Sequence, residues 1–346
     1  MIAENVIARY PPYVSSADRL SALQAILRKK AIPAMLVTDP LNIRYLTGFV
    51  ATEALLLVQT RRSTLIVDGR YAEAAAALRS NDVRVADRAN LVALLAKIPR
   101  CAFEEDHVTV ARLQRWKALF KNTKFIRLSG LVEGLRRKKD SSEITCMRRA
   151  RSLTNTVLAR VPSYLVPGVT EKHVANRILT AMLELGADGL AFEAIVAFGK
   201  NSSLPHHRAG RAVLRRRDIV QIDIGAKWRG YCADRSEVFF VGEPTDRQRS
   251  AYEAVHSALR ASMRAAKAGI ACADLDARAR KHLSAFPPFP HALGHGVGLD
   301  VHEGIVLAAR SKDFLLDKEV IAIEPGVYFE GEFGIRLEDT VVVNDS

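Results

Sequence analysis

Apolar and polar positions in the first 130 residues follow the pattern expected of an α/β domain. Residues 17–30 place leucine and isoleucine on one helical face. Helical patterns also occur at 72–80 and 108–119. Three short apolar runs, each bounded by turn-forming residues, predict strands at 34–39, 54–60 and 63–69. Strands combined with helices in this way predict a mixed α/β domain.

A second domain is predicted to begin near residue 136. Asp140 and Glu143 form a D-x-x-E capping signal, and apolar residues then recur at helical spacing, so a long helix starts here. We therefore place the domains at 1–135 and 136–346. Further along, the pattern predicts a helix over 170–186, strands over 190–200 and 213–241, helix over 245–285, and strands after residue 290.

Composition limits the possible classes of protein. With 346 residues, 49% of them hydrophobic, the chain has enough apolar material for two cores. There is no apolar run of eighteen residues, so no transmembrane helix is expected. The N-terminal segment MIAENVIARYPPYVSS lacks the features of a secretory signal. Four cysteines without C-x-x-C spacing suggest buried free thiols in a reducing cytoplasm.

The net charge of +13 is not taken as evidence for nucleic-acid binding. Its basic clusters lie far apart along the chain and lack interleaved aromatic residues, which favours solvated surface positions. A positive field would still attract peptides that carry a free carboxylate.

Two aspartates lie on a predicted β-hairpin in the segment IVQIDIGAKWRGYCADRSEVFFV. If the turn centres near 228–229, Asp223 and Asp234 lie opposite each other, where paired Cβ atoms are about 4.5–5.5 Å apart. Two carboxylates so close among apolar residues repel each other unless a cation lies between them. In an alternative interpretation, one aspartate caps a turn and the other pairs with Arg235.

Histidines and glutamates further along supply more candidate ligands. His291, His295 and His302 lie within twelve residues of one another, among glycines that let the backbone approach a ligand closely. Glu324 ends an apolar strand, and Glu338 interrupts a second apolar stretch. A glutamate in such a strand must be paired, coordinated or exposed to solvent, and exposure on an edge strand remains the alternative for either one.

Charge balance favours a joint interpretation of these residues as a site for two divalent cations. Four carboxylates match the charge of two such ions, and one neutral histidine completes the set. Oxygen-rich ligation suits Mn²⁺ or Co²⁺ at least as well as Zn²⁺. Two metals about 3.5–4 Å apart can share a water, lower its pKa and polarise a carbonyl, which is hydrolytic chemistry. The predicted ligands are Asp223, Asp234, His295, Glu324 and Glu338.

The chain resembles the M24 family of metallopeptidases, the pita-bread enzymes that include prolidase, aminopeptidase P and methionine aminopeptidase. Five segments carry the resemblance in order: FGKNSSLPHH, QIDIGAKWRGYCAD, HALGHGVGLDVHE, AIEPGVY and GIRLED. The first domain resembles the creatinase-type N-terminal domain through DPLNIRYLTGF and LIVDGRY. The resemblance implies an α/β (α+β) chain, with a creatinase-type N-terminal domain followed by a catalytic pita-bread domain.

The resemblance also implies how the ligands share the metals. Asp223 would chelate one ion, His295 and Glu324 would bind the other, and Asp234 and Glu338 would bridge them. Mn²⁺ is the expected metal, with Co²⁺ and Zn²⁺ as alternatives.

Catalytic roles follow from the same resemblance. His206 matches the family histidine placed near the substrate and the developing negative charge. His291 and His302 match histidines that contact the substrate carbonyl or the peptide. Glu324 matches the group that shuttles the proton, in addition to being a ligand.

The expected activity is hydrolysis of Xaa-Pro bonds at the N-terminus of short proline-containing peptides, as an aminopeptidase or a dipeptidase. The resemblance implies a homodimer, and we expect a cytoplasmic enzyme with no membrane or nucleic-acid partner. Two departures from the family pattern bear on rate and specificity: Glu237 replaces an arginine, and Val306 stands where some prolidases carry one. The alternative function is a catalytically impaired pita-bread protein that binds protein or nucleic acid.

Overall fold

The computed structural model describes residues 16–78 and 83–344, in two compact units, 1–136 and 137–346. The expectation about a secretory signal concerns residues before Ser16 and lies outside the described part. No described helix is long and apolar enough to cross a membrane. The four cysteines are free and buried, as expected from their spacing.

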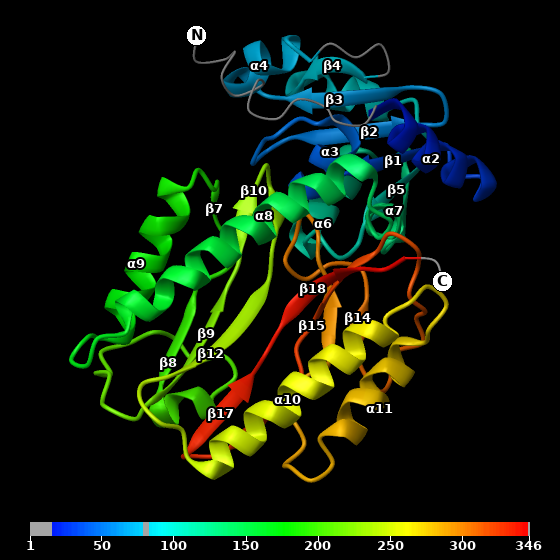
Figure 1. Ribbon diagram of the computed structural model, residues 1–346. Helices are drawn as coiled ribbons and strands as arrows, with labels where there is room; N and C mark the ends of the chain where they lie inside the picture. Colours follow the sequence, from blue (N-terminus) through cyan, green and yellow to red (C-terminus); the bar gives the residue numbers. More distant parts are fainter. Residues whose placement is uncertain (1–15, 79–82, 345–346) are drawn as a thin grey trace. The chain divides into compact units, whose positions relative to one another are not determined.

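The N-terminal unit is built on a six-stranded sheet in the order β4-β3-β2-β1-β5-β6 (Figure 1). Only β2 runs antiparallel to its neighbours; the other five strands share one direction. The strands are β1 (Ala34–Val37), β2 (Leu55–Gln59), β3 (Ser63–Val67), β4 (Val83–Asp87), β5 (Arg100–Glu104) and β6 (Lys124–Leu128). The helices are α2 (Ser16–Lys29), α3 (Pro40–Thr47), α4 (Ala72–Ala76), α5 (Leu91–Leu95), α6 (Val110–Leu119) and α7 (Leu131–Arg136), with 3-10 turns at Gly69–Tyr71 and Arg88–Asn90.

The C-terminal unit places its strands between two pairs of helices, α8 with α9 and α10 with α11 (Figure 1). These helices are α8 (Ser141–Arg160), α9 (Glu171–Glu184), α10 (Asp246–Ala265) and α11 (Cys272–His282), with 3-10 turns at Val161–Tyr164 and Gly199–Ser203. The strands near α8 and α9 are β7 (Gly189–Leu190), β8 (Ile195–Phe198), β9 (Ile219–Ile224), β10 (Ala226–Trp228), β11 (Tyr231–Cys232) and β12 (Arg235–Phe240). The remaining strands are β13 (Gly294–Gly296), β14 (Val306–Leu307), β15 (Val320–Ile323), β16 (Gly326–Phe329), β17 (Phe333–Arg336) and β18 (Asp339–Val342). The predicted mixed α/β architecture is confirmed.

Local sequence explains where these helices begin and end. Asp140 and Glu143 form a complete capping box at the start of α8, as predicted. The side chain of Thr170 accepts the backbone N–H of His173 and caps α9. The helical segment predicted over 245–285 consists of two helices, α10 and α11. α10 ends at Ala265, and the connection to α11 contains Gly269, whose φ is +85°.

Candidate metal centre

The hairpin β9–β12 brings Asp223 and Asp234 to one face, in a register that differs from the predicted one. Its turn lies at Arg229–Gly230, one residue later than expected, and Asp223 pairs with Ser236 rather than with Asp234. When a hairpin turn moves by one residue, each residue pairs with a partner two positions further along the opposite strand. Because side chains alternate with period two, the two aspartates still face the same side.

The histidine ligand comes from a short strand in which glycines allow close packing. His295 is the central residue of β13 and pairs with Ala322 of β15. A Cβ on Gly294 would lie 2.0 Å from the carbonyl oxygen of Ala322, and one on Gly296 would lie 2.1 Å from that of Glu303. Glycines on both sides therefore let β13 lie against its neighbours and hold His295 in place.

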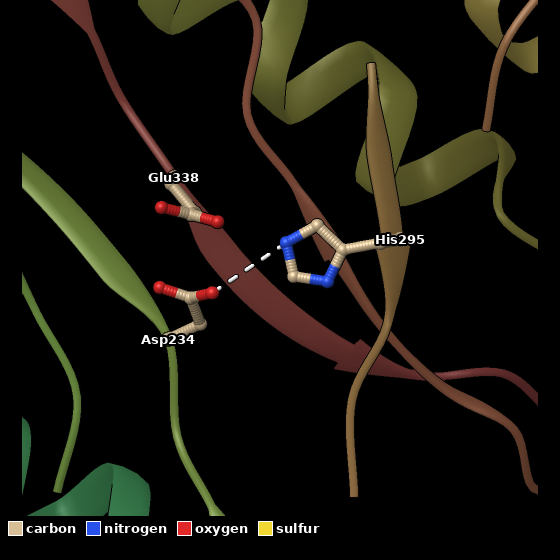
Figure 2. Close-up of side chains that lie close together, drawn as sticks. All are labelled: Asp234, His295 and Glu338. Carbon is tan, nitrogen blue, oxygen red and sulfur yellow. Dashed lines mark ion pairs between the residues drawn. The ribbon is translucent and has the colours of Figure 1, made fainter. Parts of the chain in front are cut away.

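Asp234, His295 and Glu338 converge in the interior of the C-terminal unit (Figure 2). One ligand atom from each lies within 4.8 Å of the others, and Nε2 of His295 is 3.5 Å from Oδ2 of Asp234. All three residues are at most 7% exposed. Ser236 lies on the same face and donates its hydroxyl to Oε2 of Glu338 at 2.9 Å, so this carboxylate is held by a neighbour on the hairpin.

Arg336 connects the other two predicted ligands, Asp223 and Glu324. Its Nη2 donates to Oδ2 of Asp223 at 2.6 Å, and its Nε lies 3.8 Å from Oε2 of Glu324. Glu324 follows β15, and its Oε1 is 3.9 Å from Nε2 of His295. The buried Asp223 keeps its second oxygen, Oδ1, without a hydrogen-bond partner among the described residues.

Burial and mutual repulsion perturb these groups strongly. Burial, followed by the charge of Asp223, raises the pKa of Asp234 well above its usual value. Burial and the charge of Asp234 do the same to the pKa of Glu338. Burial raises the pKa of Glu324 to about 7, although Arg336 acts in the opposite direction. Burial lowers the pKa of His295 to about 4, so this imidazole is neutral at physiological pH.

The donor set fits divalent cations. Four carboxylates face one guanidinium, which leaves an excess of buried negative charge. A neutral imidazole and the unpartnered Oδ1 of Asp223 offer further lone pairs. Clusters of buried carboxylates with one imidazole suit cations that prefer oxygen ligands.

All five predicted ligands line one cavity of about 270 Å³, together with two of the predicted catalytic residues, His206 and His302. The ring of His302 lies 4.1 Å from that of His295, edge to face. His291 is not among the lining residues. Nε2 of His291 shares a hydrogen bond with Oη of Tyr328 at 2.9 Å. Nδ1 of His291 lies 3.9 Å from Oε2 of Glu324.

The two departures from the family pattern lie outside this cavity. Glu237 points away from the face of Ser236, and its carboxylate is 3.6 Å from Nη2 of Arg235. Val306 is 51% exposed and does not line the cavity.

Sequence reasoning did not assign roles to several residues of the site. Arg336 and Tyr328 lie within the segments GIRLED and AIEPGVY. The contact of Arg336 with Asp223 joins residues more than a hundred positions apart, and its contact with Tyr328 depends on side-chain rotamers. Glu193 and Arg208 line the cavity with their charged groups 4.0 Å apart. No sequence spacing pointed to that pair.

Comparisons with known proteins agree with this geometry. The family profile described as Metallopeptidase family M24 matches residues 145–345, and that of the Creatinase/Prolidase N-terminal domain matches residues 19–138. An uncharacterized peptidase of Bacillus subtilis (strain 168) is 31% identical over 337 residues, which cover 95% of this chain and 96% of that protein.

Two solved structures are similar over nearly their whole length. A Xaa-Pro dipeptidase from Bacillus anthracis superposes with a TM-score of 0.92 at 32% identity, covering 96% of each chain. An X-Pro aminopeptidase from Thermotoga maritima gives a TM-score of 0.84 at 33% identity, covering 91% of this chain and 94% of that one. The pita-bread fold expected from the sequence is thereby confirmed.

Proposed function

Because the chain belongs to the metallopeptidase family M24, we propose that it hydrolyses Xaa-Pro bonds at the N-terminus of short peptides with two divalent metal ions. The observation that carries the proposal is the buried group of Asp234, His295 and Glu338, in a cavity that Asp223 and Glu324 also line. With domains at 1–135 and 136–346, all the proposed catalytic residues belong to the second domain.

In this proposal Asp223 would hold one ion, His295 and Glu324 would hold the other, and Asp234 and Glu338 would contact both. Such ions supply Lewis acidity toward a peptide carbonyl and activate water for attack. Mn²⁺ suits the oxygen-rich set, with Co²⁺ and Zn²⁺ as alternatives.

The protein's own groups orient the ligands. Arg336 holds Oδ2 of Asp223 and leaves Oδ1 available for a ligand. Ser236 donates to Oε2 of Glu338, and Arg336 in turn donates from Nε to the Ser236 hydroxyl at 3.1 Å. Partners of this kind fix the direction of each carboxylate and tune its basicity.

Four residues act on the substrate or beside it. His206 and His302 line the cavity, where they can donate hydrogen bonds to a substrate carbonyl as negative charge develops on its oxygen. Glu324 lines the same cavity and carries the proton toward the departing amine. His291 is held by Tyr328 beside Glu324, so we assign it to the same catalytic set.

Dipeptidase and aminopeptidase activities are both kept in the proposal, since relatives of both kinds are similar to this chain. The test is a side-by-side assay of an Xaa-Pro dipeptide and an Xaa-Pro-Yaa tripeptide with added Mn²⁺, Co²⁺ or Zn²⁺. A peptide with alanine in place of proline is the matched control. We expect hydrolysis of at least one proline peptide and little of the control; a folded protein that cleaves neither with any of the metals would rule the proposal out.

A cytoplasmic homodimer is part of the same proposal. Sedimentation equilibrium is expected to give twice the chain mass of 38.1 kDa, and the monomer mass at assay concentrations would contradict it. The alternative of an impaired binding protein is not favoured, because the complete ligand set is present and the similar proteins are peptidases.

A further inference from the structure

The sheet of the N-terminal unit has a crevice where such sheets bind ligands. From β1 the chain builds β2, β3 and β4 on one side, and it then crosses to build β5 and β6 on the other. The parallel strands β1 and β5 therefore lie at the point where the strand order reverses. In open α/β sheets, ligands bind outside the carboxyl ends of the strands at this point.

A cavity of about 370 Å³ lies at this position, a size typical of sites for small molecules. Thr38 follows β1, His107 and Thr109 follow β5, and Arg88 follows β4, so the carboxyl ends of three parallel strands contribute to its lining. The buried side chains of Leu55 and Ile66 also line it and supply apolar surface.

The lining of this cavity carries more positive than negative charge. Arg88, Arg112 and Arg115 all line it, and Glu53 is the carboxylate among the lining residues. Glu53 is already shared, because its Oε2 lies 3.4 Å from Nη1 of Arg88 and 3.0 Å from Nη2 of Arg70. Within residues 16–78 and 83–344, no ion pair is formed by Arg112 or Arg115.

Arg112 shows the effect of this imbalance most clearly. Its guanidinium carbon lies 5.5 Å from the centroid of the Trp116 ring, and the residue is half-buried. Burial and then the charge of Arg88 lower the pKa of Arg112 below its usual value, with a further contribution from Arg115. Like charges held together in this way are relieved when an anion binds between them.

The N-terminus of helix α6 lies at this cavity and adds to its positive potential. Thr109 caps this ten-residue helix by accepting the N–H of Arg112, and Thr109 itself lines the cavity. The N-terminus of a helix carries a partial positive charge and attracts anions.

We propose that this cavity is an accessory binding site for a small phosphate-bearing molecule, separate in chemistry from the peptidase site. Guanidinium groups bind phosphate oxygens in bidentate fashion, and the hydroxyls of Thr52 and Thr109 can donate to the remaining oxygens. The apolar lining leaves room for the organic part of a phosphate ester. The ligand is either inorganic phosphate or such an ester, since both present the same group.

The test is isothermal titration calorimetry of the full-length protein with inorganic phosphate and, separately, with glycerol phosphate. Chelator is present throughout, so that phosphate cannot bind a metal in the other domain. Arg112→Gln and Arg115→Gln remove one cation each. Arg84→Gln is the matched control, because Arg84 is an exposed arginine of β4 that does not line the cavity.

We expect saturable binding of at least one probe that weakens about tenfold or more in Arg112→Gln and Arg115→Gln and is unchanged in Arg84→Gln. Tighter binding of glycerol phosphate would identify an ester as the ligand, and tighter binding of inorganic phosphate would identify the free ion. An unchanged thermal midpoint without phosphate shows that the variants fold. The proposal fails if neither probe binds at 10 mM, a concentration of about tenfold over a millimolar Kd, or if all three variants bind like the wild type.

Discussion

Buried like charge dominates the candidate metal centre at the level of single residues. Asp234 and Glu338 are almost fully buried, and burial together with the charges of neighbouring carboxylates raises the pKa of both carboxyl groups. Arg336 offsets part of this charge through Asp223 and Glu324, but it makes no direct ion pair with Asp234 among the described contacts. The centre is therefore strained by electrostatics until cations occupy it, and stability and activity should respond in opposite directions when a ligand is neutralised.

The variant Asp234→Asn tests whether stability and activity change in opposite directions. Losing this carboxylate, a proposed metal ligand, should lower kcat/KM by at least about 100-fold, the scale on which even outer partners of a metal site act. The thermal midpoint of the metal-free variant should rise above that of the metal-free wild type, because folding no longer raises the pKa of a buried carboxyl group at a cost in stability. The midpoint is measured by scanning calorimetry with chelator and with Mn²⁺. A metal-free variant that melts well below the wild type would show that Asp234 is not under repulsive strain.

At the level of elements, one buried carboxylate organises the segment that carries His206. Glu171, at the start of α9, is fully buried. Its oxygens accept from Phe198 N, Asn201 Nδ2 and Gly210 N at 2.8–3.0 Å, and from His207 Nε2 at 2.8 Å. Burial by itself would raise the pKa of Glu171, but the hydrogen bonds from Asn201 and His207 outweigh it and lower the pKa.

Glu171→Gln should therefore cost about 2–3 kcal/mol of unfolding free energy at pH 7, because charge-assisted hydrogen bonds are lost. Since the folded pKa lies below the unfolded value near 4.5, this stability is present above pH 4.5 and is lost as pH falls through the folded pKa. Urea denaturation at pH 7 and in acid measures the difference. Glu184→Gln, on an exposed position of the same helix, is the control. An equal difference between wild type and Glu171→Gln at both pH values would contradict the account.

A buried ion pair supports the loop that carries His302. Nζ of Lys139 lies 2.9 Å from Oε1 of Glu303, with side chains only 2% and 5% exposed. Oε2 of Glu303 accepts the N–H of Asp300 at 3.2 Å, and its carboxylate packs against Gly298. The pair thus holds both the start of the second unit and the loop next to His295, a proposed metal ligand.

Replacing Lys139 alone, or Lys139 together with Glu303, separates the effect of the pair on stability from its effect on the position of His302. Lys139→Met alone should cost about 3–5 kcal/mol, because it removes the cation that lies against a buried carboxylate. The double variant Lys139→Met/Glu303→Leu should recover most of that stability, since an apolar pair avoids the desolvation cost. We expect its kcat/KM to stay at least about tenfold below wild type, as the loop has lost its acceptor for Asp300. If activity returns along with stability, the pair has no part in positioning His302.

Several elements could be predicted from the sequence because their signals are local. The capping box of α8 and the alternation in β9–β12 depend on residues close together in the chain. The hairpin turn was misplaced by one residue, yet both aspartates were assigned to the correct face because the side-chain period is two. In contrast, the contact between Arg336 and Asp223 joins residues 113 positions apart, and no spacing rule reveals it.

Across the whole molecule, the edge strands β4 and β6 escaped prediction for a physical reason, and the inner strand β5 was not predicted either. β4 and β6 lie at the two edges of the N-terminal sheet and are largely exposed or half-buried, so their sequences, VRVAD and KFIRL, mix charged residues with apolar ones. The inner strands β1, β2 and β3 are buried on both faces and carry the continuous apolar runs that marked them. Family and fold class could be read from the motifs, whereas the crevice at β1 and β5 emerges only from strand order.

The central claim is that metal held by the buried carboxylates is required for cleavage of Xaa-Pro bonds. The most direct measurement strips the full-length protein with chelator and then titrates it with Mn²⁺ while Xaa-Pro hydrolysis is followed. We predict that chelation abolishes hydrolysis, that activity returns and saturates at two ions per chain, and that Asp234→Asn does not respond. Hydrolysis that persists unchanged after the metal has been removed would contradict the account.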